Sequence, residues 1–200
     1  MKKISYFLFA LFLVAGCCPK ENSVKQQPTV KSALDVIHSR KSVRTYTDQP
    51  VTLQQIDTLL RAGMAAPSGM DRRPWEFIVV TDRDLMRQWA DTLPYGSMLK
   101  QAQAAIVVCG HSDKDKGGSP YWYVDCSAAT ENILLAAEAI GLGAVWTAAY
   151  PYEERMGVVY KAYNLPEDVI PLCIIPIGYP TGAEQPKVKY DSTRIHIDKW

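Results

Sequence analysis

The sequence predicts one α/β or α+β domain, and three observations support this. Helical patterns interleave with strand-like apolar runs from residue 32 to residue 180. The composition, 48% hydrophobic and 22% charged, is typical of a globular domain, and the roughly 170 residues after the first thirty are the size of one ordinary domain. The strand-length runs are few and widely spaced, so the connections differ from regular βαβ units.

Helical spacing of apolar residues marks four segments before the middle of the chain. Ser32–Ser39 carries its apolar residues on one side. Thr52 is a good N-cap for a helix over Leu53–Ala66, in which leucine, isoleucine and methionine recur at helical intervals. Two short helices are expected at Asp84–Ala90 and Ser97–Ala102.

The longest predicted helix runs from Trp122 to Ile140 and is ended by Gly141. Its middle is alanine-rich and apolar on nearly every side, so it must be buried at the centre of a domain or in a subunit interface. The small size of the domain favours the interface. A further helix is expected from Tyr152, with a stop at Asn164–Pro166.

Four apolar runs are expected to form the sheet. Trp75–Val80 and Ala104–Gly110 are buried strands, and Ile170–Pro180 is a strand with prolines at its flanks. Gly143–Pro151 is a strand or an extended loop.

The first residues have the features of an export signal. Met1–Lys3 is basic and the apolar run Tyr6–Ala15 follows it, too short for the roughly 20 residues that span a bilayer but typical of a signal-peptide core. Leu13–Cys17 resembles a bacterial lipobox, which implies cleavage before Cys17 and lipidation of its sulfur. An ordinary secretory signal or an uncleaved anchor is the alternative.

These features divide the chain into a lipoprotein signal peptide (1–16), a polar tether after lipidated Cys17 (17–31) and a folded domain (32–200). We therefore expect a protein that is exported and anchored to a membrane of the cell envelope. The tether is of the kind that keeps a domain off a membrane surface.

Composition and missing motifs exclude several classes of protein. A net charge of +1 argues against a nucleic-acid binder. Cys109, Cys126 and Cys173 have no CxxC spacing and are expected to be buried, and the three histidines lack metal-site spacing, so no metal is expected. The chain contains no GxGxxG, GxxxxGK[ST], HExxH or GxSxG.

Three segments supply groups that suit a phosphorylated planar ligand. Arg40, Lys41 and Arg44 offer donors for a phosphate, with Ser42 in the same turn. Ala65–Trp75 contains a Pro-Ser-Gly turn that exposes backbone groups, and the small residues after Gly141 leave room for a ring. Taken alone, the basic cluster would more often be a solvated loop.

In this order and spacing, the segments SRKSVRTY (39–46), APSGMDRRPWEFIVV (66–80) and NILLAAEAIGLGAVWTA (132–148) resemble the nitroreductase family of FMN-dependent oxidoreductases. The resemblance covers essentially all of residues 31–200. It implies an α+β fold in which helices flank a central mixed β-sheet. It also implies an intertwined homodimer whose two flavin sites are shared between subunits.

The resemblance also implies the residues that contact FMN. Arg40, Ser42 and Arg44 would hold the phosphate and ribityl chain, with help from Lys41 through its backbone or charge and from the late pair Lys187 and Lys189. Pro67, Ser68, Gly69 and Asp71 would approach from the second subunit, and Thr147, Ala148 and Ala149 would lie along the ring. The backbone N–H of Ala149 would point at flavin N5, with no catalytic side chain.

Two positions depart from the family pattern. Asp71 stands where Asn is usual and Arg73 where Gln is usual, and an ionised acid cannot donate a hydrogen bond. The two residues could compensate each other. These departures affect the flavin potential and substrate preference more than flavin binding.

The implied reaction is ping-pong hydride transfer from a reduced donor such as NAD(P)H, through flavin N5, to a nitroaromatic, quinone or similar acceptor. Export conflicts with a cytosolic donor, so the alternative is a membrane-tethered flavin-binding electron carrier or sensor without nicotinamide turnover. A specialised member, for example in reductive dehalogenation or flavin processing, and a structural lipoprotein with a degenerate site are the other two possibilities.

Overall fold

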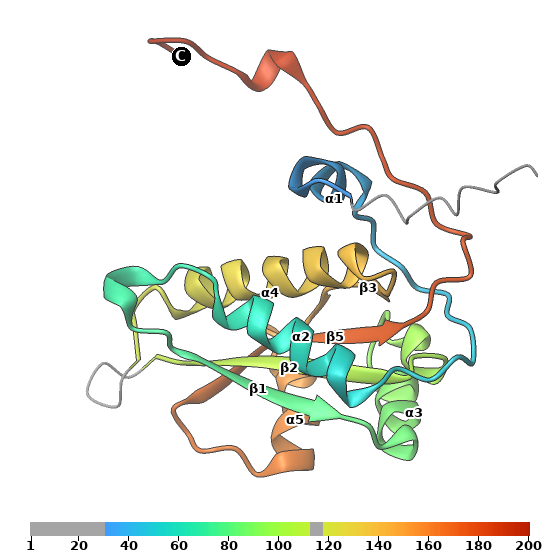
Figure 1. Ribbon diagram of the computed structural model, residues 1–200. Coiled ribbons are helices and arrows are strands. Elements are labelled where there is room, and N and C mark those ends of the chain that lie inside the picture. The colour runs from blue at the N-terminus through green and yellow to red at the C-terminus, as the bar shows by residue number, and fades with distance from the viewer. Residues whose placement is uncertain (1–30, 113–117) are drawn as a thin grey trace, which may run out of the picture. The chain divides into compact units, whose positions relative to one another are not determined.

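The computed structural model describes residues 31–112 and 118–200 (Figure 1). Lys31–Trp200 forms one compact unit. The predicted signal peptide and Cys17 lie outside the described residues, as does the predicted tether up to residue 30. The helices are α1 (Ala33–Ser39), α2 (Leu53–Met64), α3 (Arg83–Thr92), α4 (Trp122–Ala139) and α5 (Glu153–Tyr163), and the strands are β1 (Trp75–Val80), β2 (Ala104–His111), β3 (Gly143–Ala144), β4 (Thr147–Ala148) and β5 (Val169–Gly178).

The strands form one five-stranded sheet in the order β1-β2-β5-β3, and β4 also pairs with β5. Every ladder between these strands is antiparallel. Within the described residues, a parallel pairing occurs only at the isolated bridge between Ser42 and Ala144. The α+β class is confirmed, and the expected mixed character of the sheet is limited to that bridge.

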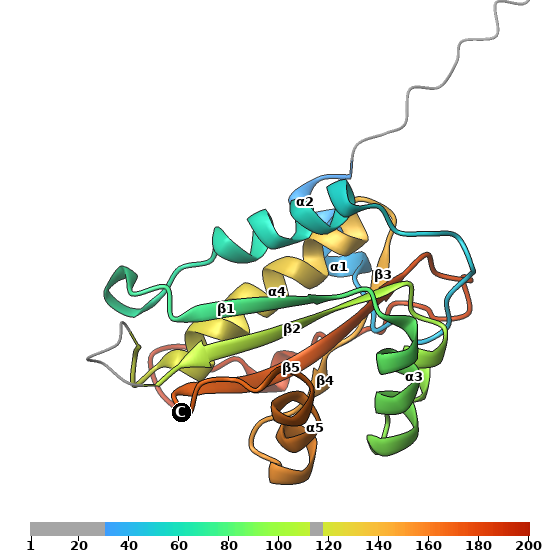
Figure 2. The same cartoon turned by 90° about the horizontal axis from the view of Figure 1, so that it is seen from below.

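Helices cover both faces of the sheet. In Figures 1 and 2, α2 and α4 lie over one face and α3 and α5 over the other. Each side has its own buried apolar cluster, one around Ile133 of α4 and one around Met86 and Trp89 of α3. Strand β2 is buried at every position except its last, because both of its faces are covered, and this explains the uninterrupted apolar run in the sequence.

The burial of α4 is provided largely by this chain itself. Cys126, Ala129, Ile133 and Ala137 are fully buried in the core beneath the helix. Other positions of α4, such as Leu135, are half-buried. One face of the predicted all-round apolar helix therefore packs within the domain, and its participation in a subunit interface stays a prediction.

Most predicted elements are present, with two differences in kind. Ser97–Lys100 is a 3₁₀ turn and not an α-helix. The Gly143–Pro151 segment forms the two short strands β3 and β4, which pair with successive parts of β5. The three cysteines of the folded domain are free and buried, as predicted.

The described part of the chain contains no helix long and apolar enough to cross a membrane. Within those same residues, no group of His, Cys, Asp or Glu side chains is arranged to hold a metal ion.

Tyr46 fastens the segment after α1 to the sheet. Its side chain is 5% exposed, and its hydroxyl donates to the carbonyls of Val43 at 2.7 Å and Pro176 at 3.1 Å. The ring lies so close to Gly178 that a Cβ there would be 2.8 Å from Tyr46 Cδ1. Tyr46 therefore fixes the position of the basic turn, residues 40–44, relative to the end of β5.

We expect Tyr46→Phe to lower the free energy of unfolding by about 1–3 kcal/mol, because two buried carbonyls lose their shared donor. Tyr190→Phe is the control, since Tyr190 is 77% exposed, and it should change stability by less than about 0.5 kcal/mol. Urea unfolding of both variants measures the difference. Equal stabilities would show that the Tyr46 hydroxyl does not anchor the turn.

Candidate functional site

Two segments that lie far apart in the sequence line one hollow of about 360 Å³. The basic turn after α1 contributes Arg40, Lys41, Ser42 and Arg44, and the segment after β5 contributes Glu184, Gln185, Lys187 and Lys189. All six residues predicted to serve the phosphate end of the ligand therefore lie around one space. We call this space the basic hollow.

Glu184 holds the backbone of the basic turn in place. Its Oε1 accepts hydrogen bonds from the N–H of Arg44 at 2.7 Å, from the N–H of Thr45 at 3.0 Å and from the Thr45 hydroxyl at 2.9 Å. Burial alone would raise the pKa of the Glu184 carboxyl, but these hydrogen bonds outweigh burial and the pKa lies below its ordinary value. Glu184 thus supports the hollow as an anion.

Two cations of the basic turn are paired with acids of α4. Arg40 Nε lies 3.0 Å from Glu131 Oε1, and Lys41 Nζ lies 3.2 Å from Glu138 Oε2. Glu131 and Glu138 are seven residues apart, so they lie on one side of the helix. Of the cations in the turn, Arg44 has no carboxylate partner among the ion pairs of the described residues.

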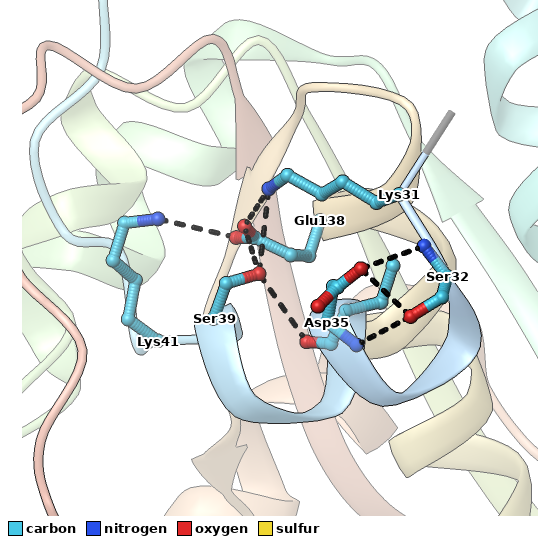
Figure 3. Close-up of polar contacts among 7 residues, drawn as sticks. Lys31, Ser32, Asp35, Ser39, Lys41 and Glu138 are labelled. Atoms are coloured by element: carbon cyan, nitrogen blue, oxygen red, sulfur yellow. Dashed lines mark hydrogen bonds and ion pairs between the residues drawn. The ribbon is translucent and has the colours of Figure 1, made fainter. Parts of the chain in front are cut away.

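Glu138 is the centre of a small polar network (Figure 3). Its Oε1 accepts from Lys31 Nζ at 2.7 Å and from the Ser39 hydroxyl at 2.8 Å. Burial would raise the pKa of this carboxyl, but the hydrogen bonds from Lys31, Ser39 and Lys41 lower it below its ordinary value. The ammonium group of Lys41 is therefore directed toward α4 (Figure 3).

A second, smaller cavity of about 140 Å³ shares Arg44 with the basic hollow. Thr147 and Ala148 of β4 line it, as predicted for the ring of the ligand. Its other lining residues were not predicted and are Leu93, Pro94, Tyr95, Met98, Val145, Trp146 and Arg155. This ring cavity is smaller than the roughly 300 Å³ of a typical ligand pocket, so it suits one edge of a ligand that continues into the basic hollow.

Two buried donors of residues that line the ring cavity have no hydrogen-bond partner in the part of the chain that the structure describes. They are the hydroxyl Oγ1 of Thr147 and Nε of Arg155. Buried polar atoms are normally satisfied, and leaving one unpaired costs about 1–3 kcal/mol. Neither atom is accessible from the cavity in this conformation, so each would have to turn toward it to donate to a ligand that presents acceptors to this wall.

The structure contradicts the predicted role of the Ala149 amide. Ala149 is 1% exposed, and its N–H donates to the carbonyl of Leu172 in β5 at 3.0 Å. The N–H of Tyr150 donates to the same carbonyl at 3.0 Å. The Ala149 N–H is thus already used to extend the pairing of β4 with β5, and it cannot be the donor to flavin N5 in this conformation.

Pro67, Ser68, Gly69 and Asp71 line neither the basic hollow nor the ring cavity of their own chain. Their loop is held internally: Gly69 N–H donates to Asp125 Oδ1 at 2.9 Å, and Ser68 Oγ accepts from Arg73 N–H at 3.0 Å. Their predicted contact with the flavin of a second subunit stays a prediction.

The two departures from the family pattern compensate each other, as predicted. Arg73 binds Asp71 through two hydrogen bonds, Nε to Oδ1 at 2.7 Å and a terminal nitrogen to Oδ2 at 2.5 Å. The bonds from Arg73 lower the pKa of Asp71 below its ordinary value. Both residues, with Met70, have φ near 50°, and such backbone strain is often found at functional sites.

The fold and the two adjoining cavities define a class of protein. It is an α+β protein with a cation-lined hollow for an anionic group, next to a cavity whose free donors suit the edge of a ring. Comparison with known proteins identifies the family within this class. The model of the nitroreductase family matches residues 37–93 and 86–179, and this chain belongs to that family.

The relatives agree with this assignment. A Methanothermobacter thermautotrophicus protein, provisionally named NADH dehydrogenase/NAD(P)H nitroreductase, is 46% identical over 169 residues, which cover 84% of this chain and 87% of that protein. A Bacteroides thetaiotaomicron protein with the same provisional name has a crystal structure that superposes on this chain with a TM-score of 0.80. The two sequences are 60% identical, and the match covers 84% of this chain and 98% of that protein's chain. A provisionally named Desulfovibrio desulfuricans nitroreductase, solved in complex with FMN, is 26% identical, covers 85% and 98%, and has a TM-score of 0.72.

Glu184 gives the basic turn a defined pH dependence. Because its pKa is lowered on folding, it stabilises the fold above the ordinary pKa of glutamate, and this stabilisation is lost as the pH falls through the lowered value. We expect Glu184→Gln to lower stability at pH 7 and to reduce the loss of stability on acidification. Urea unfolding at pH 7 and below pH 4 measures both effects. Glu167→Gln, at an exposed position, is the control, and an identical pH slope in both variants would contradict the assignment.

Proposed function

We propose that this chain is an FMN-dependent NAD(P)H oxidoreductase. One observation carries the proposal. The basic turn and the pair Lys187 and Lys189, more than 140 positions apart in the sequence, line a single hollow that shares Arg44 with the ring cavity. Relatives named FMN reductase (NADPH) and a relative solved with FMN support the choice of cofactor.

The groups present fit FMN. Arg40, Arg44, Lys187 and Lys189 would surround the phosphate with cations, and the Ser42 hydroxyl adds a neutral donor. Arg40 would exchange its exposed partner Glu131, whose side chain is 46% exposed, for the phosphate, because an exposed ion pair contributes little. Lys41 would remain on the buried Glu138 and contribute its backbone.

Thr147 and Ala148 would lie along the isoalloxazine ring at the wall of the ring cavity. When bound, FMN would supply the redox chemistry, which is the transfer of a hydride from NAD(P)H to N5 and of two electrons to the acceptor in ping-pong order. The protein binds and orients the ligand and needs no side-chain acid or base. The N–H donor to N5 must come from a residue other than Ala149.

We further propose that the active form is a homodimer. Members of the family are generally flavin-bound homodimers that use NAD(P)H. The loop with Pro67, Ser68, Gly69 and Asp71 is exposed at Met70 and Asp71 and lines neither the basic hollow nor the ring cavity of its own chain. In the homodimer this loop would complete the flavin site of the partner subunit. The acceptor would be an electron-poor molecule such as a nitroaromatic or a quinone.

Spectroscopy of the purified homodimer tests the function. We expect a bound yellow chromophore with flavin absorbance that NADH or NADPH bleaches without air and that a nitroaromatic or quinone restores. Bleaching by dithionite but not by either nicotinamide would favour the alternative, a tethered flavin-binding electron carrier or sensor. Absence of flavin after reconstitution with FMN would exclude both functions and favour a structural protein.

The location is a separate proposal that rests on the sequence before residue 31. The chain would be exported and held at a membrane of the cell envelope by lipid on Cys17, with residues 17–31 as the tether. We expect full-length protein from a bacterial host to partition into detergent, and Cys17→Ser to partition into water with unchanged flavin absorbance. Cys18→Ser is the control, and equal partitioning of all three proteins would contradict lipidation at Cys17.

A further inference from the structure

Arg155 is a partly buried cation at the ring cavity, with 19% of its side chain exposed, and no carboxylate of the described residues is hydrogen-bonded to it. It lies in the first turn of α5, and its guanidinium carbon lies 3.8 Å from the centre of the Tyr152 ring. Its nearest carboxylate is Glu154, at 3.8 Å from Nε, and the Glu154 side chain is 66% exposed. That distance is too long for a hydrogen bond, so Nε remains unsatisfied.

The walls of the ring cavity carry donors and positive charge and no acid. Arg44, Arg155 and the unpaired Thr147 hydroxyl are among its lining residues, and none of the lining residues is Asp or Glu. A ligand edge that presents only acceptors, and above all one that becomes negative, complements such a wall. The cavity thus differs from a simple apolar slot for a ring.

Arg44 lines both cavities, and this decides which edge of the flavin would reach this wall. Given the proposed FMN site, the phosphate would lie in the basic hollow and the ribityl chain would lead past Arg44 into the ring cavity. The ribityl chain leaves the ring at N10, and the N1–C2=O edge lies on the same side of the ring as that chain. This edge carries two acceptors and no donor, which matches Thr147 and Arg155.

We propose that Arg155 contacts the N1–C2=O edge of the flavin, with Thr147 as its neutral companion, and that its charge sets the ease of flavin reduction. Uptake of a hydride adds two electrons and one proton to the flavin, which leaves one negative charge on the pyrimidine ring unless a second proton binds. A guanidinium within about 4 Å favours the charged form, by an amount that depends strongly on local dielectric. Arg155 therefore makes reduction easier and keeps N1 unprotonated.

The decisive experiment measures flavin properties and not turnover. In Arg155→Met loaded with FMN, we expect the midpoint potential to become more negative. We also expect the proton affinity of the reduced flavin, followed by its absorbance against pH, to rise about tenfold or more. Arg155→Lys should lie between this variant and the wild type, because it keeps the charge but not the planar geometry. Lys161→Met, an exposed cation farther along α5, should change neither quantity.

A binding comparison separates Arg155 from the phosphate residues. The ratio of FMN affinity to riboflavin affinity is measured by quenching of flavin fluorescence. This ratio should stay unchanged in Arg155→Met. It should fall about tenfold or more in Arg44→Met, because a charge-assisted bond to the phosphate contributes about 1.5–3 kcal/mol. Thr147→Val should weaken FMN and riboflavin equally. If Arg155→Met does not hold FMN, Arg155→Lys and Thr147→Val carry the test.

Unchanged midpoint potential and unchanged proton affinity in an FMN-loaded Arg155→Met protein would overturn the inference about Arg155. In that case, bleaching of the wild-type flavin by NADH or NADPH would still support the proposed function. A fall of the FMN to riboflavin ratio in Arg155→Met would also overturn the inference about Arg155, because Arg155 would then belong to the phosphate. A wild-type protein that binds no FMN would remove the proposed function itself.

Discussion

The attachment of residues 42–46 to the sheet is the constraint on which the rest of the site depends. Ser42 forms a parallel bridge with Ala144, and Tyr46 forms an antiparallel bridge with Pro180. Between these points, Glu184 accepts hydrogen bonds from the backbone N–H groups of Arg44 and Thr45. A flexible basic loop would lose much of its binding free energy when it becomes ordered on the ligand. This turn is already fixed in position by backbone pairing, by the buried Tyr46 hydroxyl and by the Glu184 carboxylate. The same attachment places Arg44 where the basic hollow and the ring cavity meet.

The cations of the basic turn are not equivalent, and this difference comes from α4. Glu138 is nearly buried, with 9% of its side chain exposed, and it takes three donors, so removing any one of them would leave an anion less well compensated. Glu131 is far more exposed and can give up Arg40 at little cost. Among the described residues, the three cations of the turn thus differ: Lys41 is paired with a nearly buried acid, Arg40 with an exposed acid, and Arg44 with no carboxylate.

The sequence predicted those parts of the fold and site that depend on local pattern. The buried strands β1 and β2 follow from uninterrupted apolar runs, and α4 from its length and its glycine stop. The residues of the basic turn were predicted to bind a phosphate because several cations and a hydroxyl cluster within five positions. Arg155 could not be found in this way, because a single arginine in a helix gives no signal until the fold places it beside Thr147. Glu184 was not predicted for a related reason. A carboxylate next to a proposed phosphate site is electrostatically unfavourable, and only the fold shows that it accepts hydrogen bonds from the backbone of the turn.

The Ala149 amide shows that a match to a motif is not sufficient to assign the hydrogen-bond partner of a backbone group. A match to a motif can place a residue near a ligand, but the hydrogen-bond partner of a backbone group depends on strand register. In this chain, Ala148 pairs with Cys173, and the next amide continues along the strand to Leu172. One residue of extra pairing is enough to remove the donor, and sequence pattern does not determine where a two-residue strand ends.

The pairing of β4 with β5 also makes Cys173 the strand partner of Ala148, which lines the ring cavity. Cys173 is fully buried, and burial raises its pKa to about 12, while burial likewise raises the pKa of Cys109 to about 12 and that of Cys126 above its ordinary value. At neutral pH these sulfurs are protonated, and nucleophilic attack or oxidation requires the thiolate. If the ring cavity holds a flavin that passes electrons to electrophilic molecules, as proposed, the sulfur of the adjoining core would resist modification by those molecules.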